Sequence, residues 1–150
     1  MTQPHQIAQL QTEAVKLLAQ LEPRAASLKV KERQQIPLQE MPAQPPMERA
    51  ANMQEVAYGY SPQQARVEAM RCLQCAKKNC MEGCPVKIDI PGFIREIAAG
   101  NFEAAIAIIK QTSLLPAICG RVCPQEKQCQ LYCTLGKSLK DVDQSVSIGR

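Results

Sequence analysis

Apolar residues recur at helical spacing near the start of the chain. Between residues 6 and 21 they fall at Ile7, Leu10, Ala14, Val15, Leu17, Leu18 and Leu21. Steps of three and four residues place these side chains on one face of an α-helix, which we expect Pro23 to end. Residues 24–47 hold four prolines among polar residues. That composition predicts an extended connector lying on a surface rather than a packed unit.

The middle of the chain predicts shorter helices. Residues 47–56 can form one, and Ser61-Pro62 offers an N-cap and a first-turn proline for a helix that ends near Cys72. Asp89-Ile90-Pro91 begins the next helix, which Gly100 closes. Its expected apolar face comprises Phe93, Ile94, Ile97 and Ala98.

Asn101 is expected to cap the helix that follows, with an inward face of Phe102, Ala105, Ile106 and Ile109. These two antiparallel helices would form a hairpin between two groups of cysteines. Helical turns are expected around residues 114–118 and 125–132. Since apolar and polar residues alternate only over very short stretches, the predicted fold class is all-α, a small helical domain.

The composition suggests that something besides apolar packing holds this domain together. Aromatic residues make up 3 % of the 150 residues and Trp is absent, but there are eight cysteines. The N-terminus lacks the features of a signal peptide, and the apolar runs are too short to cross a bilayer. We therefore expect a cytoplasmic protein without membrane contact, whose thiols bind metal instead of forming disulfides.

The net charge of +4 does not indicate nucleic-acid binding, because the basic residues are spread evenly and form no stripe. Four of them lie among the first cysteines: Arg71, Lys77, Lys78 and Lys87. We expect these residues to offset the negative charge of anionic clusters. A solvated polar face is the alternative explanation.

The cysteines form two groups, Cys72-x2-Cys75-x4-Cys80-x3-Cys84-Pro85 and Cys119-x3-Cys123-x5-Cys129-x3-Cys133. Closely spaced thiols followed by Cys-Pro are typical of bacterial ferredoxins, in which the cysteine before proline binds the other cluster. The pattern thus predicts one 4Fe–4S cluster on the first three cysteines and a second cluster beginning at Cys84. The second group must return one ligand to the first cluster, and Cys133 is the candidate. Zinc is the rival metal, although only Cys72 and Cys75 have its usual spacing.

Several blocks of the sequence, in order, strongly resemble one known family. They include Arg71-Cys72-Leu73, Gly83-Cys84-Pro85-Val86 and Ile118-Cys119-Gly120-Arg121-Val122-Cys123-Pro124. They are similar to the N-terminal iron–sulfur domain of the NADPH-dependent glutamate synthase small subunit. Dihydropyrimidine dehydrogenase and the large subunit of NADH-dependent ferredoxin:NADP oxidoreductase share this module. The resemblance covers residues 41–150, which gives a two-cluster domain after an N-terminal helix and connector, residues 1–40.

The resemblance implies an alpha-helical ferredoxin-like fold and two sets of ligands. The first cluster would be held by Cys72, Cys75, Cys80 and Cys133, and the second by Cys84, Cys123 and Cys129. In the family the fourth ligand of the second cluster is a Glu or Gln shortly after the stretch that corresponds to residues 147–150, and the equivalent of Cys119 is not a ligand. Three alternatives stay open: incomplete ligation, substitution by Cys119, or a sequence that is part of a longer one.

In the family an FAD domain with a Gly-rich fingerprint follows, but the seven glycines here contain no G-x-G-x-x-G. No set of residues suggests nucleophilic or acid–base catalysis. We therefore expect FAD and NAD(P)H on a following domain or a flavoprotein partner. The chain would relay electrons between that flavin and a second redox subunit. The alternatives are a standalone ferredoxin-like carrier and a zinc-stapled interaction module.

Overall fold

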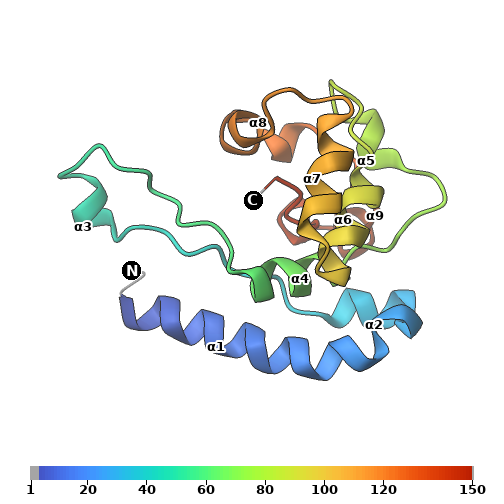
Figure 1. The fold of residues 1–150 in the computed structure, drawn as a ribbon, viewed down its shortest axis with the longest axis horizontal. Helices are drawn as coiled ribbons and strands as arrows, with labels where there is room; N and C mark the ends of the chain where they lie inside the picture. The colour runs from blue at the N-terminus through green and yellow to red at the C-terminus, as the bar shows by residue number, and fades with distance from the viewer. Residues whose placement is uncertain (1–3, 150) are drawn as a thin grey trace.

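The computed structural model describes residues 4–149, with side chains from residue 7 onward. Its regular structure is helical (Figure 1), which confirms the predicted fold class, and the described residues add only an isolated antiparallel bridge between Ala43 and Ala57. The α-helices are α1 Pro4–Leu21, α2 Val30–Gln35, α3 Pro46–Arg49, α4 Pro62–Met70, α5 Asn79–Glu82, α6 Ile90–Ala99, α7 Phe102–Lys110, α8 Pro116–Val122 and α9 Thr134–Leu139. The 3-10 helices are η1 Glu22–Ser27, η2 Gln125–Lys127 and η3 Val142–Gln144.

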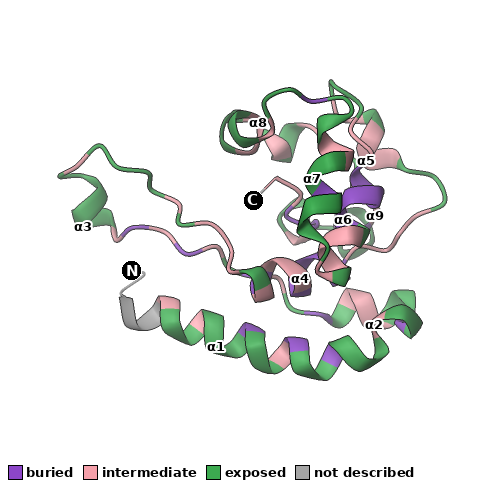
Figure 2. Ribbon diagram, in the orientation of Figure 1, coloured by how far each residue is buried: buried purple, intermediate pink, exposed green. Residues whose placement is uncertain are grey.

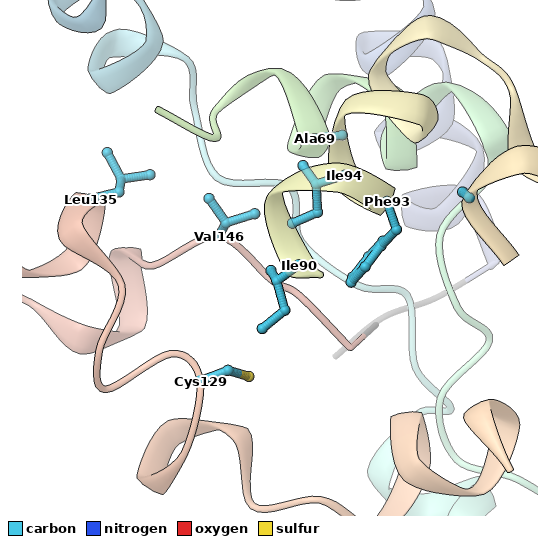
Figure 3. Packing of buried hydrophobic residues seen from close by; sticks show 8 residues of the cluster. Ala69, Ile90, Phe93, Ile94, Cys129, Leu135 and Val146 are labelled. Carbon is cyan, nitrogen blue, oxygen red and sulfur yellow. The ribbon is translucent and has the colours of Figure 1, made fainter. Parts of the chain in front are cut away.

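Helix α4 lies between two apolar clusters and connects them. Val67 and Met70 pack against the N-terminal segment through Leu18, Leu21, Leu28 and Ile36. Ala69 belongs to the second cluster, with Ile90, Phe93, Ile94, Ala105, Cys129, Leu135 and Val146. Figure 3 shows this second cluster, where the side chains of α6 face Val146 and Cys129. Because α4 is apolar on both sides, most of its last two turns are buried (Figure 2).

The predicted start of α4 is confirmed. Ser61 is its N-cap, and its hydroxyl accepts a hydrogen bond from the backbone N–H of Gln64 at 3.2 Å. The Gln64 side chain accepts one in return from the Ser61 N–H at 3.1 Å. This capping box satisfies two backbone donors that would otherwise lack partners at the helix start.

The hairpin of α6 and α7 is also confirmed, but two details differ from the prediction. Gly100 closes α6 in the left-handed region, with φ of 87°. The Asn101 side chain does not cap α7; it donates to the Glu96 carboxylate at 3.1 Å. The expected inward face of α7 is partly wrong, since Phe102 is 42 % exposed and Ile106 38 % exposed. Ala105 is the buried α7 residue of the core, and Ile108 and Ile109 pack against the same cluster.

The prediction of a wholly extended connector over residues 24–47 is wrong for its first half, which contains η1 and α2. These turns form because Leu28 and Ile36 find buried positions against α4. The helix predicted over residues 47–56 is only α3. Beyond α3 the chain turns back, and the Gln44 N–H bonds the Val56 carbonyl at 2.7 Å. Residues 41–59 therefore form an arm with α3 at its tip (Figure 1).

No helix among residues 4–149 is both long enough and apolar enough to cross a membrane.

Candidate metal centres

Four of the predicted ligands line one small cavity, which we call the first cavity. Cys72 follows α4, Cys75 ends the next loop, Cys80 lies in α5 and Cys133 precedes α9. Apolar residues complete the wall, among them Leu135 and Val146. The structure thus brings Cys133 to the three cysteines of the first group, although 53 residues separate it from Cys80 (133 − 80).

The loop from Cys72 to Cys75 is held from both sides. The Arg33 guanidinium donates to the carbonyls of Met70 at 2.8 Å and Cys72 at 3.1 Å. Gln74 adopts a left-handed backbone, with φ of 50°, and its side-chain amide donates to the Cys72 sulfur at 3.5 Å. The same amide also bonds the Pro91 carbonyl at 3.1 Å, which ties the loop to α6.

The other four cysteines line a second cavity of about 410 Å³ beside α6, α7 and α8. They are Cys84, Cys119, Cys123 and Cys129. The remaining wall is largely apolar, with isoleucines from α6 and α7, and it carries no charged side chain. Cys84 lies here with Cys129, away from the other cysteines of its own sequence group.

Gly83 allows this exchange of cysteines between the two groups. A Cβ atom at residue 83 would lie 2.5 Å from the Tyr132 ring and 2.7 Å from the Gln128 carbonyl oxygen. Such contacts do not occur in folded proteins, so only glycine lets the turn after α5 approach residues 128–132 this closely. The sequence showed Gly83 as part of a motif but did not reveal its neighbours.

Burial raises the pKa of four of the thiols, those of Cys72, Cys80, Cys123 and Cys129. Burial raises the pKa of Cys72 to about 11, and the neighbouring Cys133 and Cys75 add to the effect. Burial, with Cys72 and Cys133 nearby, raises the pKa of Cys80 to about 12. In the second cavity burial, together with Cys84 and Cys123, raises the pKa of Cys129 to about 11. These three thiols are therefore affected electrostatically by other cysteines of their own cavity.

Cys119 lies with the predicted ligands of the second cluster, although the resemblance leaves it out of the ligand set. It lines the second cavity, where its thiol lies 3.8 Å from the Ser113 hydroxyl. Cys123 lies in the same wall, and burial together with the neighbouring Cys119 raises the pKa of the Cys123 thiol. Each iron of a four-iron cube takes one ligand, so a complete ligand set has four members.

A buried ion pair fixes the backbone around Cys72, and sequence reasoning missed it. Arg71 and Glu68, both nearly inaccessible, form a salt bridge of 2.6 Å. Arg71 also donates to the carbonyls of Ile36, Gln144 and Ser145, while the Glu68 carboxylate accepts from the N–H groups of Gln39 and Ser147. The pair thereby joins the N-terminal segment, α4 and the C-terminal segment next to the first cavity.

The basic residues expected to offset cluster charge are mostly neutralised by other partners, so that expectation is wrong for three of the four. Lys78 pairs with Asp89 at 2.8 Å and Lys87 with Glu82 at 3.0 Å. Arg71 pairs with Glu68 as described above. Lys77 is exposed.

The donor set fits a 4Fe–4S cluster in each cavity better than a single ion. Four thiols in an apolar wall are the soft ligands that such clusters take. The thiolates around one tetrahedral zinc lie roughly 3.8 Å apart, since each Zn–S bond is about 2.3 Å. Within residues 7–149, whose side chains the structure describes, no three or more His, Cys, Asp or Glu side chains converge to hold a single metal ion. A four-iron cube spreads its ligands farther.

A further pocket, of about 910 Å³, lies away from the first cavity, between the arm and α8. Met41 and Tyr58 line it on the arm, and the ion pair between Glu55 and Arg121 (2.5 Å) spans it. Cys123 is the cysteine in its wall, so this pocket and the second cavity are neighbours.

Comparison with known families gives an identification consistent with this geometry. Residues 49–150 match the family described as dihydropyrimidine dehydrogenase domain II, 4Fe-4S cluster. The chain belongs to this family. Both cysteine groups lie within residues 49–150, the part of the chain that matches this 4Fe–4S family. Helices α1, η1 and α2 lie before residue 49.

Known members of the family occur within larger oxidoreductases. The chain is 46 % identical to UacF of Escherichia coli strain K12 over 103 residues, which is 68 % of this chain and 16 % of that protein. It is 40 % identical to the small chain of NADPH glutamate synthase of Halomonas elongata, over 61 % of this chain and 19 % of that one.

A third relative is PreT of Escherichia coli O157:H7, named a subunit of NAD-dependent dihydropyrimidine dehydrogenase, with 40 % identity over 65 % of this chain and 23 % of that subunit. The chain spans about a fifth of the length of the curated relatives it matches.

Proposed function

We propose that this chain is an electron-transfer module that holds two 4Fe–4S clusters and works beside a flavin. The main observation behind the proposal is that the eight cysteines line two apolar cavities, four in each. Each cavity combines cysteines from both sequence groups. When bound, each cluster would take up and release one electron at a time.

For the first cluster we propose the four ligands Cys72, Cys75, Cys80 and Cys133. Their common cavity supports this set. The hydrogen bonds of Arg33 and Gln74 would hold the Cys72–Cys75 loop in one conformation, so that the thiols need little rearrangement to bind. Buried apolar neighbours, among them Leu135, would keep water away from the sulfur atoms.

For the second cluster we propose Cys84, Cys123 and Cys129. The resemblance leaves Cys119 out of this set, and the Cys119 thiol lies 3.8 Å from the Ser113 hydroxyl. The fourth ligand would be the Glu or Gln that the resemblance locates shortly after residues 147–150. Ile148 and Gly149 line the second cavity, which supports a ligand from this segment.

The proposed partner is a flavoprotein domain or subunit that binds FAD and NAD(P)H, with a second redox subunit receiving the electrons. The relatives named for NADPH and NAD dependence support this partnership. NAD(P)H delivers a hydride, whereas clusters carry single electrons, so a flavin must convert one into the other. We also propose a cytoplasmic location, in keeping with eight cysteines that form no disulfide.

The test is the absorption spectrum of the anaerobically purified chain, followed by chemical reduction. A brown protein whose visible absorption bleaches with dithionite supports the electron-transfer module. A colourless protein that contains zinc would contradict it and favour the zinc-stapled interaction module.

A further inference from the structure

Arg33 carries a charge that no described carboxylate neutralises. Its guanidinium donates four hydrogen bonds, all to backbone carbonyls: those of Leu28 at 3.2 Å, Ala25 at 3.3 Å, Met70 at 2.8 Å and Cys72 at 3.1 Å. Within residues 4–149 no acidic group lies at ion-pair distance from it, unlike Arg71, Lys78 and Lys87. The positive charge is therefore held in place, partly buried, next to the first cavity.

The charge of Arg33 acts on Cys72. The Arg33 guanidinium donates to the Cys72 carbonyl at 3.1 Å and to the Met70 carbonyl, two residues before it, at 2.8 Å, so its charge is fixed beside this ligand. The Gln74 side chain adds an N–H donor to the same sulfur at 3.5 Å. A nearby cation and N–H donors to a sulfur ligand both favour the more negative, reduced state of an iron–sulfur cluster.

The second cavity offers no comparable cation. Its wall is formed by cysteines, apolar residues, glycines and two glutamines, all of them uncharged. The described side-chain hydrogen bond to one of its sulfurs is the long contact of Ser113 with Cys119. The wall of the first cavity is uncharged as well, so the difference is the cation bonded to the Cys72 backbone. Among the described residues, no basic side chain donates a hydrogen bond to the backbone of a cysteine in the second cavity.

We propose that Arg33 raises the reduction potential of the cluster in the first cavity, which makes that cluster the easier of the two to reduce. This inference rests on the proposed function, since it requires a cluster in each cavity. Arg33 forms no bond to the cluster and is a positioning residue whose charge acts through Cys72. It lies outside residues 49–150, so the N-terminal segment would contribute a redox property that the family match does not include.

The test is a redox titration of the reconstituted 150-residue chain, followed by EPR of the reduced clusters. The signal that survives in Cys123→Ser is assigned to the first cluster. In Arg33→Gln the equilibrium constant for reduction of that cluster should fall by threefold to about tenfold. A tenfold fall lowers the reduction potential by about 59 mV for one electron. The second cluster should stay unchanged.

Three further variants separate charge from structure. Arg33→Lys keeps the charge and should stay within about twofold of the wild type. Arg24→Gln removes a cation of the same segment that is exposed and paired with Glu32, and should have no effect. Val30→Glu keeps every hydrogen bond of Arg33 and adds a carboxylate three residues away on α2, at an exposed position. It should lower the first potential even if Arg33→Gln does not fold.

An unchanged first potential in both Arg33→Gln and Val30→Glu would overturn the inference. So would an equal fall in Arg33→Lys and Arg33→Gln, which would mark a purely structural role. Either result leaves two clusters in the protein and the proposed function intact. A wild-type chain without cluster signals would instead refute the proposed function.

Discussion

Burial opposes ionisation of the thiols in both cavities, and this property can be measured residue by residue. Cys72 and Cys80 have pKa values of about 11 and 12, chiefly through desolvation. In the folded, cluster-free chain these thiols stay protonated at neutral pH. The proton is lost only as pH rises towards 11, whereas an unfolded cysteine ionises near 8.5.

We therefore expect slow alkylation of Cys72 in the folded, cluster-free chain. At pH 8 a thiol of pKa about 11 is ionised roughly once in a thousand, against about a quarter for free cysteine, and only the thiolate reacts. Iodoacetamide labelling read by mass spectrometry should show Cys72 reacting roughly 250-fold more slowly than in urea, the ratio of these ionised fractions. The difference should shrink as pH approaches 11. Equal rates in the folded and urea-unfolded chain at pH 8 would contradict the burial described here.

The cysteines of the second cavity should differ in importance. Cys84→Ser should remove the second cluster, because it deletes one of three proposed thiolate ligands. Cys119→Ser should leave the cluster content nearly unchanged, because the proposed ligand set does not include Cys119. Iron and sulfide analysis after anaerobic reconstitution measures both variants. Loss of a cluster in Cys119→Ser would make Cys119 a ligand and refute the assignment taken from the resemblance.

Among the elements, α4 has the most demanding position, since it joins the two apolar clusters and ends at Cys72. The Arg71–Glu68 pair at its C-terminal end bonds the backbone of two segments that are distant in sequence. Loss of one partner would leave a buried, unpaired charge, and the cost of that is much larger than the loss of an exposed ion pair.

Arg71→Gln should accordingly destabilise the chain by about 3–5 kcal/mol, the usual range for breaking a buried pair. Arg24→Gln, which breaks the exposed pair with Glu32, is the matched control and should cost about 1 kcal/mol or less. Urea unfolding of both variants, in the same cluster state as the wild type, gives the free energies of unfolding. Similar values for the two variants would show that the Arg71–Glu68 pair does not hold the segments together.

On the scale of the whole molecule, the sequence predicted the helical class and the sorting of the cysteines better than it predicted the contacts between segments. Ser61, Asp89 and Gly100 mark helix ends through local chemistry, which is readable from sequence. Arg33 bonds the carbonyls of Met70 and Cys72, which lie 37 and 39 positions farther along the chain. Gly83 lies against residues 128 and 132. No local pattern encodes such partners. The sequence therefore predicts extended chain where α2 forms, and it does not point to Arg33 as the cation beside Cys72.

The chain as a whole should not react with NADPH by itself. It has no Gly-rich dinucleotide motif, and a hydride needs a flavin to be split into single electrons. Anaerobic addition of NADPH should leave the visible absorption of the cluster-loaded chain unchanged. Addition of a flavoprotein domain that binds FAD, in cis or as a subunit, should restore bleaching. Prompt bleaching without flavin would reveal a hydride-accepting site in this fold and contradict the relay.

The stoichiometry of iron and sulfide in the anaerobically reconstituted chain tests the central claim most directly. Four proposed cysteine ligands in the first cavity and three in the second predict two clusters' worth of both elements in an intact, folded chain. Double integration of the EPR signal after full reduction should agree, with one spin for each cluster. One cluster's worth of iron and sulfide, with the chain intact and folded, would contradict the account, because only one of the two cavities would then hold a cluster.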